Sequence, residues 1–307
     1  KSHDFQISTD GSREIVYGQS VHRDEFGISK GTFWSPNGEK LAFYRMDQSM
    51  VTDYPQVDIP EIGFDHPETQ SCIATPAPDK YPMAGMTSHK VTVGIYNPET
   101  KQTIYLKSGD PTDRYFTNIS WSPDGQKVYI IELNRDQNHS QLFRYDAVTG
   151  EKEALLYEEK HDKYVEPQHP ITFIPWNEHQ FIYQSQQDGY NHLYLFDLSQ
   201  GMMHPMETYG PTKLMIPFTQ ITKGEWLVQD ILGFNEKTKE VIIMSTEQSP
   251  LQSNAYAVSL KDGKRRLIGD AEGVHRVQLS ENGKYIYGRD NDGNLVSVIS
   301  NNTITTL

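Results

Sequence analysis

The sequence predicts an all-β fold, a β-propeller of four-stranded blades. Two observations carry this prediction: a strand–turn–strand phrase recurs along the chain, and a second such phrase follows the copies of the first. Aromatic residues make up 11% of the 307 residues, with 18 Tyr against 12 Phe and 4 Trp. Tyr suits short strands, because its ring packs on a pleated face while its hydroxyl reaches water.

The first phrase places Ser-Pro-Asn-Gly or Ser-Pro-Asp-Gly, or a weaker form of them, between two short apolar runs. Asn-Gly and Asp-Gly supply the positive φ that tight hairpin turns need. The flanks alternate apolar and polar residues, as half-buried strands do. Copies occupy residues 33–44, 120–130 and 277–287, and degraded copies surround residues 173–177 and 231–235.

The second phrase is also a strand, an Asp/Asn-rich turn and a strand, and it begins at Thr92, Gln141, His192 and Ala255. Two hairpins make one four-stranded blade, so the chain holds roughly five blades, with a strand pair left over at Phe5 to Tyr17. A β-sandwich also uses short strands, but its strands are not copies of one another. The repeats therefore favour the propeller.

One segment interrupts the series of repeated strand pairs. Residues 53–88 are rich in Pro, Asp and Glu and separate two strands of one predicted blade. Insertions of this length are either functional or disordered.

The charge of the chain excludes several classes of partner. The net charge of -13 argues against nucleic acid, whose phosphates need a basic face, and against an anionic membrane surface. An acidic surface either attracts cationic groups, such as the free amine of a peptide, or serves only solubility.

The sequence predicts no catalytic residue, no metal site and no cofactor in this chain. The Gly-x-Ser-x-Gly pattern of hydrolases occurs at Gly27-Ile28-Ser29-Lys30-Gly31. The nucleophile elbow of an α/β-hydrolase, however, needs a strand before the serine and a helix after it. The single cysteine, Cys72, lies in a Pro-rich stretch without a nearby base. Residues 290–293 are only faintly like a calcium loop and suit a hairpin turn better.

Several phrases, in order along the chain, resemble one family. They are Trp34–Phe43, Tyr81–Gly85, Leu133–Asn138, Asp188–Tyr194 and Gly224–Val228. Together they resemble the N-terminal β-propeller of the dipeptidyl peptidase IV family, in the prolyl oligopeptidase clan, and most closely its bacterial type.

The resemblance implies a role within a larger protein. Residues 1–307 would be the propeller domain, part of an eight-bladed parent whose first blades precede this chain. An α/β-hydrolase domain with a Ser-Asp-His triad would follow. The parent would be a serine exopeptidase that removes dipeptides from peptide amino termini, a homodimer, and periplasmic or secreted. The alternative is a stand-alone propeller that binds a protein partner.

The resemblance also implies a substrate-binding site. In the family, two Glu residues on a short insertion hold the free amino terminus of the substrate through charge-assisted hydrogen bonds. The matching stretch here is Gln19–Phe26. Aligned on its acidic residues, the pair is Asp24 and Glu25; aligned without gaps from Trp34, it is Arg23 and Asp24. The alternative is that these charges are solvated and pair with Arg23.

A second position departs from the family pattern. The family has an Arg in the substrate pocket before a Pro, and here that position is Glu166. The resemblance therefore gives Arg23 and Glu166 as further pocket residues. Glu166 either adds negative potential for an amine or caps the edge of a blade.

Overall fold

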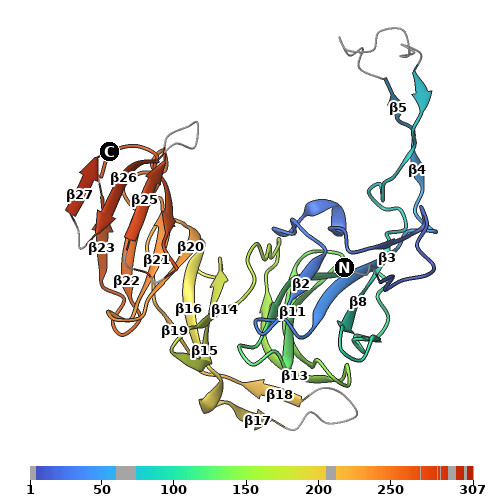
Figure 1. Cartoon of the computed structure of the whole chain (residues 1–307), viewed down its shortest axis with the longest axis horizontal. Helices are drawn as coiled ribbons and strands as arrows, with labels where there is room; N and C mark the ends of the chain where they lie inside the picture. Colours follow the sequence, from blue (N-terminus) through green and yellow to red (C-terminus); the bar gives the residue numbers. More distant parts are fainter. Residues whose placement is uncertain are drawn as a thin grey trace.

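The computed structural model describes residues 5–59, 74–204, 212–269, 271–281, 283, 285–289, 295–300 and 303–306 (Figure 1). Regular structure in these residues is β-strand, apart from two short 3-10 segments, η1 (His22–Asp24) and η2 (Leu198–Gln200). The predicted all-β class is confirmed. No helix in this part of the chain is long and apolar enough to span a membrane.

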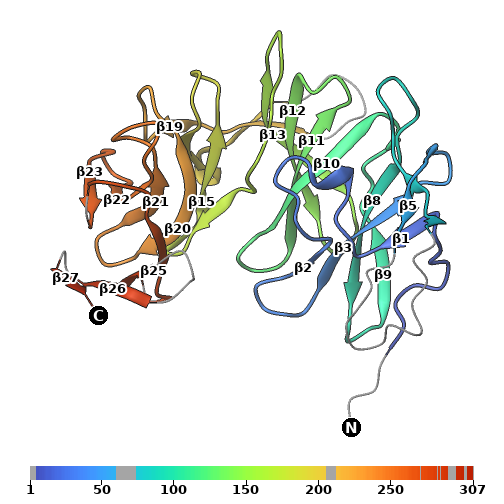
Figure 2. The same cartoon turned by 90° about the horizontal axis from the view of Figure 1, so that it is seen from above.

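Within the described residues, five large sheets follow one another along the chain, and each contains four successive antiparallel strand positions. They lie side by side in an open arc, with the first and last sheets at opposite ends (Figures 1 and 2). Each sheet has the strand order of a propeller blade, as predicted. The strands are β1 (Ile15–Tyr17), β2 (Thr32–Trp34), β3 (Leu41–Asp47), β8 (Lys90–Asn97) and β9 (Gln102–Tyr105) in blade 1; β10 (Arg114–Trp121), β11 (Lys127–Asn134), β12 (His139–Asp146) and β13 (Lys152–Lys160) in blade 2; β14 (Thr172–Ile174), β15 (Asn177–Ser185), β16 (His192–Asp197) and β19 (Phe218–Gln220) in blade 3; β20 (Val228–Asn235), β21 (Glu240–Ser245), β22 (Asn254–Ser259) and β23 (Arg265–Ile268) in blade 4; and β24 (Arg276–Leu279), β25 (Tyr285–Arg289), β26 (Leu295–Ser300) and β27 (Thr303–Thr306) in blade 5.

The recurring Ser-Pro-Asn/Asp-Gly phrase forms the same turn wherever it occurs. In blade 2 the Ser122 amide donates to the Lys127 carbonyl at 2.9 Å, and the Gly125 amide donates to the Ser122 carbonyl at 2.9 Å. Blade 1 repeats both bonds, and so does the weaker Ser-Glu-Asn-Gly copy in blade 5; the turn glycine has a φ near +70° in all three. A side chain is strained at that φ, which is why glycine closes the turn.

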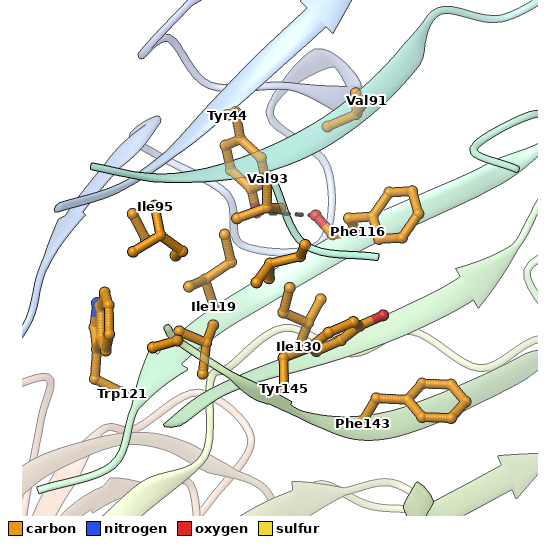
Figure 3. Packing of buried hydrophobic residues seen from close by; sticks show 14 of the residues in the cluster. Tyr44, Val91, Val93, Ile95, Phe116, Ile119, Trp121, Ile130, Phe143 and Tyr145 are labelled. Carbon is orange, nitrogen blue, oxygen red and sulfur yellow. Dashed lines mark hydrogen bonds between the residues drawn. The ribbon is translucent and has the colours of Figure 1, made fainter. Parts of the chain in front are cut away.

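The blades pack on one another through alternate residues of each strand. In β11, Val128 and Ile130 pack in the cluster shared with blade 1, whereas Tyr129 and Ile131 pack in the cluster shared with blade 3. This alternation follows from the pleat of a strand. Between blades 1 and 2, the buried Tyr44 hydroxyl donates to the Phe116 carbonyl at 2.9 Å (Figure 3).

The predicted strand pair at Phe5 to Tyr17 is wrong. Among the described residues 5–17 only β1 is a strand, and it belongs to blade 1. β1 pairs with β3 at residues 45–47, and β2 pairs with β3 at residues 41–43. The two segments share one strand position, which a loop interrupts.

This loop, residues 18–31, leaves and rejoins the strand at one point. The Gly18 amide donates to the Tyr44 carbonyl at 2.9 Å, and the Tyr44 amide donates to the Gly31 carbonyl at 3.0 Å. The two ends of the loop are therefore pressed together. A Cβ atom on Gly31 would lie 2.0 Å from the carbonyl oxygen of Gln19.

The predicted insertion between strands of one blade is confirmed at residues 53–88, between β3 and β8. Its described part is a two-stranded arm that projects from blade 1 (Figure 1). β4 (Asp53–Tyr54) pairs with β7 (Asp79–Lys80), and β5 (Val57–Asp58) pairs with β6 (Thr75–Pro76).

A second insertion, between β16 and β19, links two blades. It contains β17 (Met202–His204) and β18 (Thr212–Met215), which pair with each other. β18 also pairs in parallel with β13. This hairpin of blade 3 therefore extends the outer edge of blade 2.

Gly31→Ala should destabilise the chain by about 1–3 kcal/mol, because the new methyl group meets backbone atoms that cannot rotate away. The free energy of unfolding, measured in denaturant, checks this. Gly11→Ala is the matched control, since a Cβ there meets nothing within 4 Å. Equal stability of the two variants would show that the loop ends are not pressed together.

Candidate functional site

The loop of residues 18–31 forms one wall of a cavity on the face where β11 ends and β8 begins. The cavity has a volume of about 1040 Å³. Its other walls are the base of the arm, at residues 81–89, and the loop after β11, at residues 134–137. Tyr115 of β10 also lines it.

The loop has an unusual backbone around η1. His22, Arg23, Asp24 and Phe26 all have φ between 55° and 63°, in the left-handed region. Non-glycine residues in that region cost roughly 1–3 kcal/mol each and persist only where surrounding contacts fix them. Such strain in a protein is concentrated at ligand-binding and active sites.

Two buried histidines supply the fixing contacts. The Phe116 amide donates to Nε2 of His22 at 3.0 Å, and the His22 amide donates to Nε2 of His89 at 3.2 Å. The two rings stack with centroids 5.3 Å apart, and His22 meets the Tyr115 ring edge-on at 5.0 Å. The loop is thus tied to β10 and to the residue that directly precedes β8.

Apolar anchors complete this attachment. Val21, Phe26 and Ile28 are buried, and Phe26 packs on Tyr115 with ring centroids 5.1 Å apart. A Cβ on Gly27 would lie 2.1 Å from the carbonyl oxygen of Gln168, so the loop also touches the segment after blade 2.

Arg23 and Arg135 hold the base of the arm against the propeller. Arg23 forms an ion pair with Asp79 at 2.9 Å, and its guanidinium lies 5.0 Å from the centre of the Tyr81 ring. Arg135 pairs with Asp113 at 3.1 Å and donates to the Met86 carbonyl at 2.8 Å. Arg23 therefore pairs with the arm, and not with the acidic residues beside it.

The predicted acidic pair is divided between two environments. Glu25 lines the cavity, and within the described part of the chain no hydrogen bond or ion pair engages its carboxylate. Asp24 is exposed, is not among the residues lining the cavity, and accepts a hydrogen bond from the Ser20 hydroxyl. Of the predicted residues, the structure brings Arg23 and Glu25 together in one cavity.

Glu166 lies at a neighbouring pocket of about 450 Å³. It is exposed and accepts a hydrogen bond from the Gln168 side chain at 2.8 Å. The two hollows are adjacent, because the Val165 amide donates at 2.7 Å to the carbonyl of Gln137, which lines the first cavity.

The other sequence candidates show no catalytic or metal arrangement. Ser29 is exposed in a coil that leads into β2, so neither a strand before it nor a helix after it forms an elbow. Cys72 and residues 290–293 lie outside the described residues. Among the residues that the structure describes, no group of three or more His, Cys, Asp or Glu side chains could hold a metal ion.

Sequence analysis did not identify His22, His89 or Arg135 as parts of the site. His22 stands next to the predicted acidic residues, but its partners His89 and Phe116 are 67 and 94 positions away. No local pattern marks such pairs, since folding alone brings them together.

The histidine pair makes stability depend on pH. Both rings accept a hydrogen bond at Nε2, so both are neutral in the folded chain. Burial lowers the pKa of both, and that of His89 falls to about 4, with Arg135 and Arg23 adding to burial. In an unfolded chain His titrates near 6.5. The stability of the pair is complete above about pH 6.5 and is lost as the pH falls towards 4.

His89→Gln should flatten this dependence, because the amide oxygen of Gln can accept the His22 N–H but does not titrate. We expect the unfolding free energy of the parent to fall faster between pH 6.5 and 4, by up to about 1.4 kcal/mol per pH unit. Denaturant unfolding at several pH values measures it. His179→Gln, whose ring is exposed, should behave as the parent. The same slope in His89→Gln and in the parent would contradict the assignment.

Known proteins resemble this chain over most of its length. This chain is 47% identical to a Bacteroides ovatus protein assigned as a dipeptidyl aminopeptidase IV. The two structures match with a TM-score of 0.81, over 97% of this chain and 42% of the Bacteroides ovatus chain. Porphyromonas gingivalis dipeptidyl peptidase 4 is 24% identical, with a TM-score of 0.76 over 97% and 39%. A Phaeosphaeria nodorum protein assigned as a dipeptidyl-aminopeptidase B is 29% identical over 87% of this chain and 30% of its own.

This chain therefore spans less than half the length of each of these relatives. The family model described as the dipeptidyl peptidase IV N-terminal region matches residues 1–292. The propeller blades and the sequence phrases agree with that match, and the chain belongs to the dipeptidyl peptidase IV N-terminal region family.

Proposed function

We propose that this chain is the non-catalytic, substrate-binding and gating propeller of a serine exopeptidase of the dipeptidyl peptidase IV type. The observation that carries the proposal is the Glu25 carboxylate, which lines the cavity without a partner among the described residues. It stands on a loop whose conformation two buried histidines fix. A carboxylate held in place in this way is ready to bind a cation.

The cation that fits the proposal is the free amino terminus of a peptide. An ammonium donates charge-assisted hydrogen bonds to carboxylates. A loop held in a fixed position would set the number of residues between the bound amino terminus and the cleavage site. Asp24 follows Arg23 on the same loop and is the second carboxylate of the proposal. Its hydrogen bond from Ser20 would have to be exchanged for one from the ligand.

The catalytic step belongs to another part of the protein in this proposal. An α/β-hydrolase domain would supply the serine nucleophile and would release dipeptides. The propeller would admit the peptide and hold its end. The proposal includes a parent protein that is periplasmic or secreted.

The arm favours a contact with another protein. Its described residues Val57 and Ile59 are each 64% exposed, and Tyr54 is 43% exposed. Exposed apolar groups gathered on one projection are typical of an interaction site.

We propose that the arm contributes to a homodimer of the full-length protein. Sedimentation of that protein and of its Val57→Asp variant tests this, and a dimer unaffected by the change would refute it.

Glu25→Gln should weaken the binding of a dipeptide amide with a free amino terminus. Loss of one charge-assisted hydrogen bond is worth about 1.5–3 kcal/mol, which is roughly a ten- to hundredfold loss of affinity. Asp24→Asn should show a loss of the same kind. Titration of the 307-residue chain, followed by calorimetry or by NMR of the ligand, measures the dissociation constants.

Two controls accompany this titration. The N-acetylated dipeptide amide should bind poorly to the parent and be unaffected by either substitution. Ser29→Ala removes an exposed hydroxyl of the same loop and should leave affinity unchanged. If both acidic variants bind the free-amine peptide as the parent does, the loop is a solvated turn and the proposal fails.

A further inference from the structure

The pocket beside Glu166 has a second carboxylate at its wall that the proposed function does not use. The pocket lies between the segment 159–169, the end of β15 with the loop after it, and residues 227–229 at the start of β20. Three blades therefore contribute to it. Its walls include Glu159, the last residue but one of β13, and Ser185, the last residue of β15.

Glu159 and its neighbour Glu158 have opposite surroundings. Glu158 pairs with Lys213 at 2.7 Å and contacts His139 at 3.0 Å, and these partners hold its pKa at about 2. Glu159 lies on the other side of the strand, in the pocket. Its carboxylate accepts a hydrogen bond from the Ser185 hydroxyl at 2.8 Å and forms no ion pair within the described ranges.

Several neutral groups of the pocket accompany this carboxylate. Ser185 is 4% exposed and is fixed by the Gln187 amide, which donates to its hydroxyl oxygen at 3.0 Å. Tyr183 is buried and also lines the pocket, and Leu227 and Val228 form an apolar wall. Burial raises the pKa of Glu159, because the charged carboxylate has lost contact with water. No ion pair among the described residues offsets this loss of hydration.

The cationic groups of the pocket do not replace such a partner. Lys160 is exposed and lies 3.6 Å from Glu158. Lys163 is exposed. His161 uses Nδ1 to accept the amides of Lys163 and Tyr164. Burial raises the pKa of Glu159 by more than the Ser185 hydrogen bond and His161 together lower it.

We propose that this pocket binds the cationic side chain of a Lys or Arg residue in a bound peptide, with Glu159 as its counter-charge. The apolar wall of Leu227 and Val228 suits the methylene stem of such a side chain, and the carboxylate suits its ammonium or guanidinium head. The inference rests on the proposed function for the peptide nature of the ligand. It would give the protein a preference for basic residues near the bound end.

The test uses probes that cannot engage the amine-binding loop. N-acetyl-lysine amide and N-acetyl-arginine amide carry the cationic side chain but no free α-amine. N-acetyl-norleucine amide is the neutral control, and N-acetyl-glutamate amide tests binding of an anion by the lysines of the rim. Each is titrated into the 307-residue chain at pH 7, with calorimetry or NMR of the ligand as the readout.

We expect at least one cationic probe to bind roughly ten- to hundredfold more tightly than the norleucine probe. Glu159→Gln should abolish this preference, because Gln keeps the shape and can still accept from Ser185. Glu158→Gln is the matched control one residue away, and Glu25→Gln is the control in the other cavity. Both should retain the preference, and thermal unfolding should show that Glu159→Gln is folded.

Three outcomes would overturn the inference: equal binding of the cationic and norleucine probes, a preference that survives Glu159→Gln, or tighter binding of the glutamate probe. None of them would bear on amine capture, since every probe is acetylated. Conversely, loss of free-amine binding in Glu25→Gln tests the proposed function and leaves this pocket unaffected.

Discussion

Two hydrogen bonds from backbone amides to buried imidazole rings fix the geometry on which the candidate site depends. The Phe116 amide reaches His22, and the His22 amide reaches His89, so one short loop is bonded to two blades. The left-handed backbone of η1 is unfavourable in isolation and is kept by these bonds and by the burial of Val21, Phe26 and Ile28. The position of Glu25 follows from that attachment.

The rest of the propeller provides a rigid support for this loop. Alternate residues of each strand pack against the blade before and the blade after, so every internal blade is held on both faces. The loop of residues 18–31 and the arm both leave blade 1, while the second pocket draws on blades 2, 3 and 4. Binding residues carried by loops on a stiff scaffold are a common arrangement in proteins.

Carboxylates in and near the two hollows differ in how their charge is compensated. Glu158 and Asp79 have cationic partners within the chain, whereas Glu25 and Glu159 have none among the described residues. Glu25 keeps its exposure, and Glu159 is partly desolvated against Ser185 and Tyr183. An uncompensated carboxylate in a hollow is the feature that both proposals use, and it depends on what folding places opposite each residue.

The blades could be predicted from the sequence alone, because the turns and the alternation of apolar and polar residues that specify them are local. Ser-Pro-Asn/Asp-Gly specifies a turn that needs only its own residues, and the insertion at residues 53–88 is visible as a break in the repeat. The resemblance to the family also directed attention to the loop at Glu25. Three features depend on tertiary contacts: Ile15–Tyr17 completes blade 1, Arg23 pairs with Asp79, and Glu159 accepts from Ser185. Those contacts join residues from different blades or from distant parts of one blade, so no local pattern of side chains can specify them.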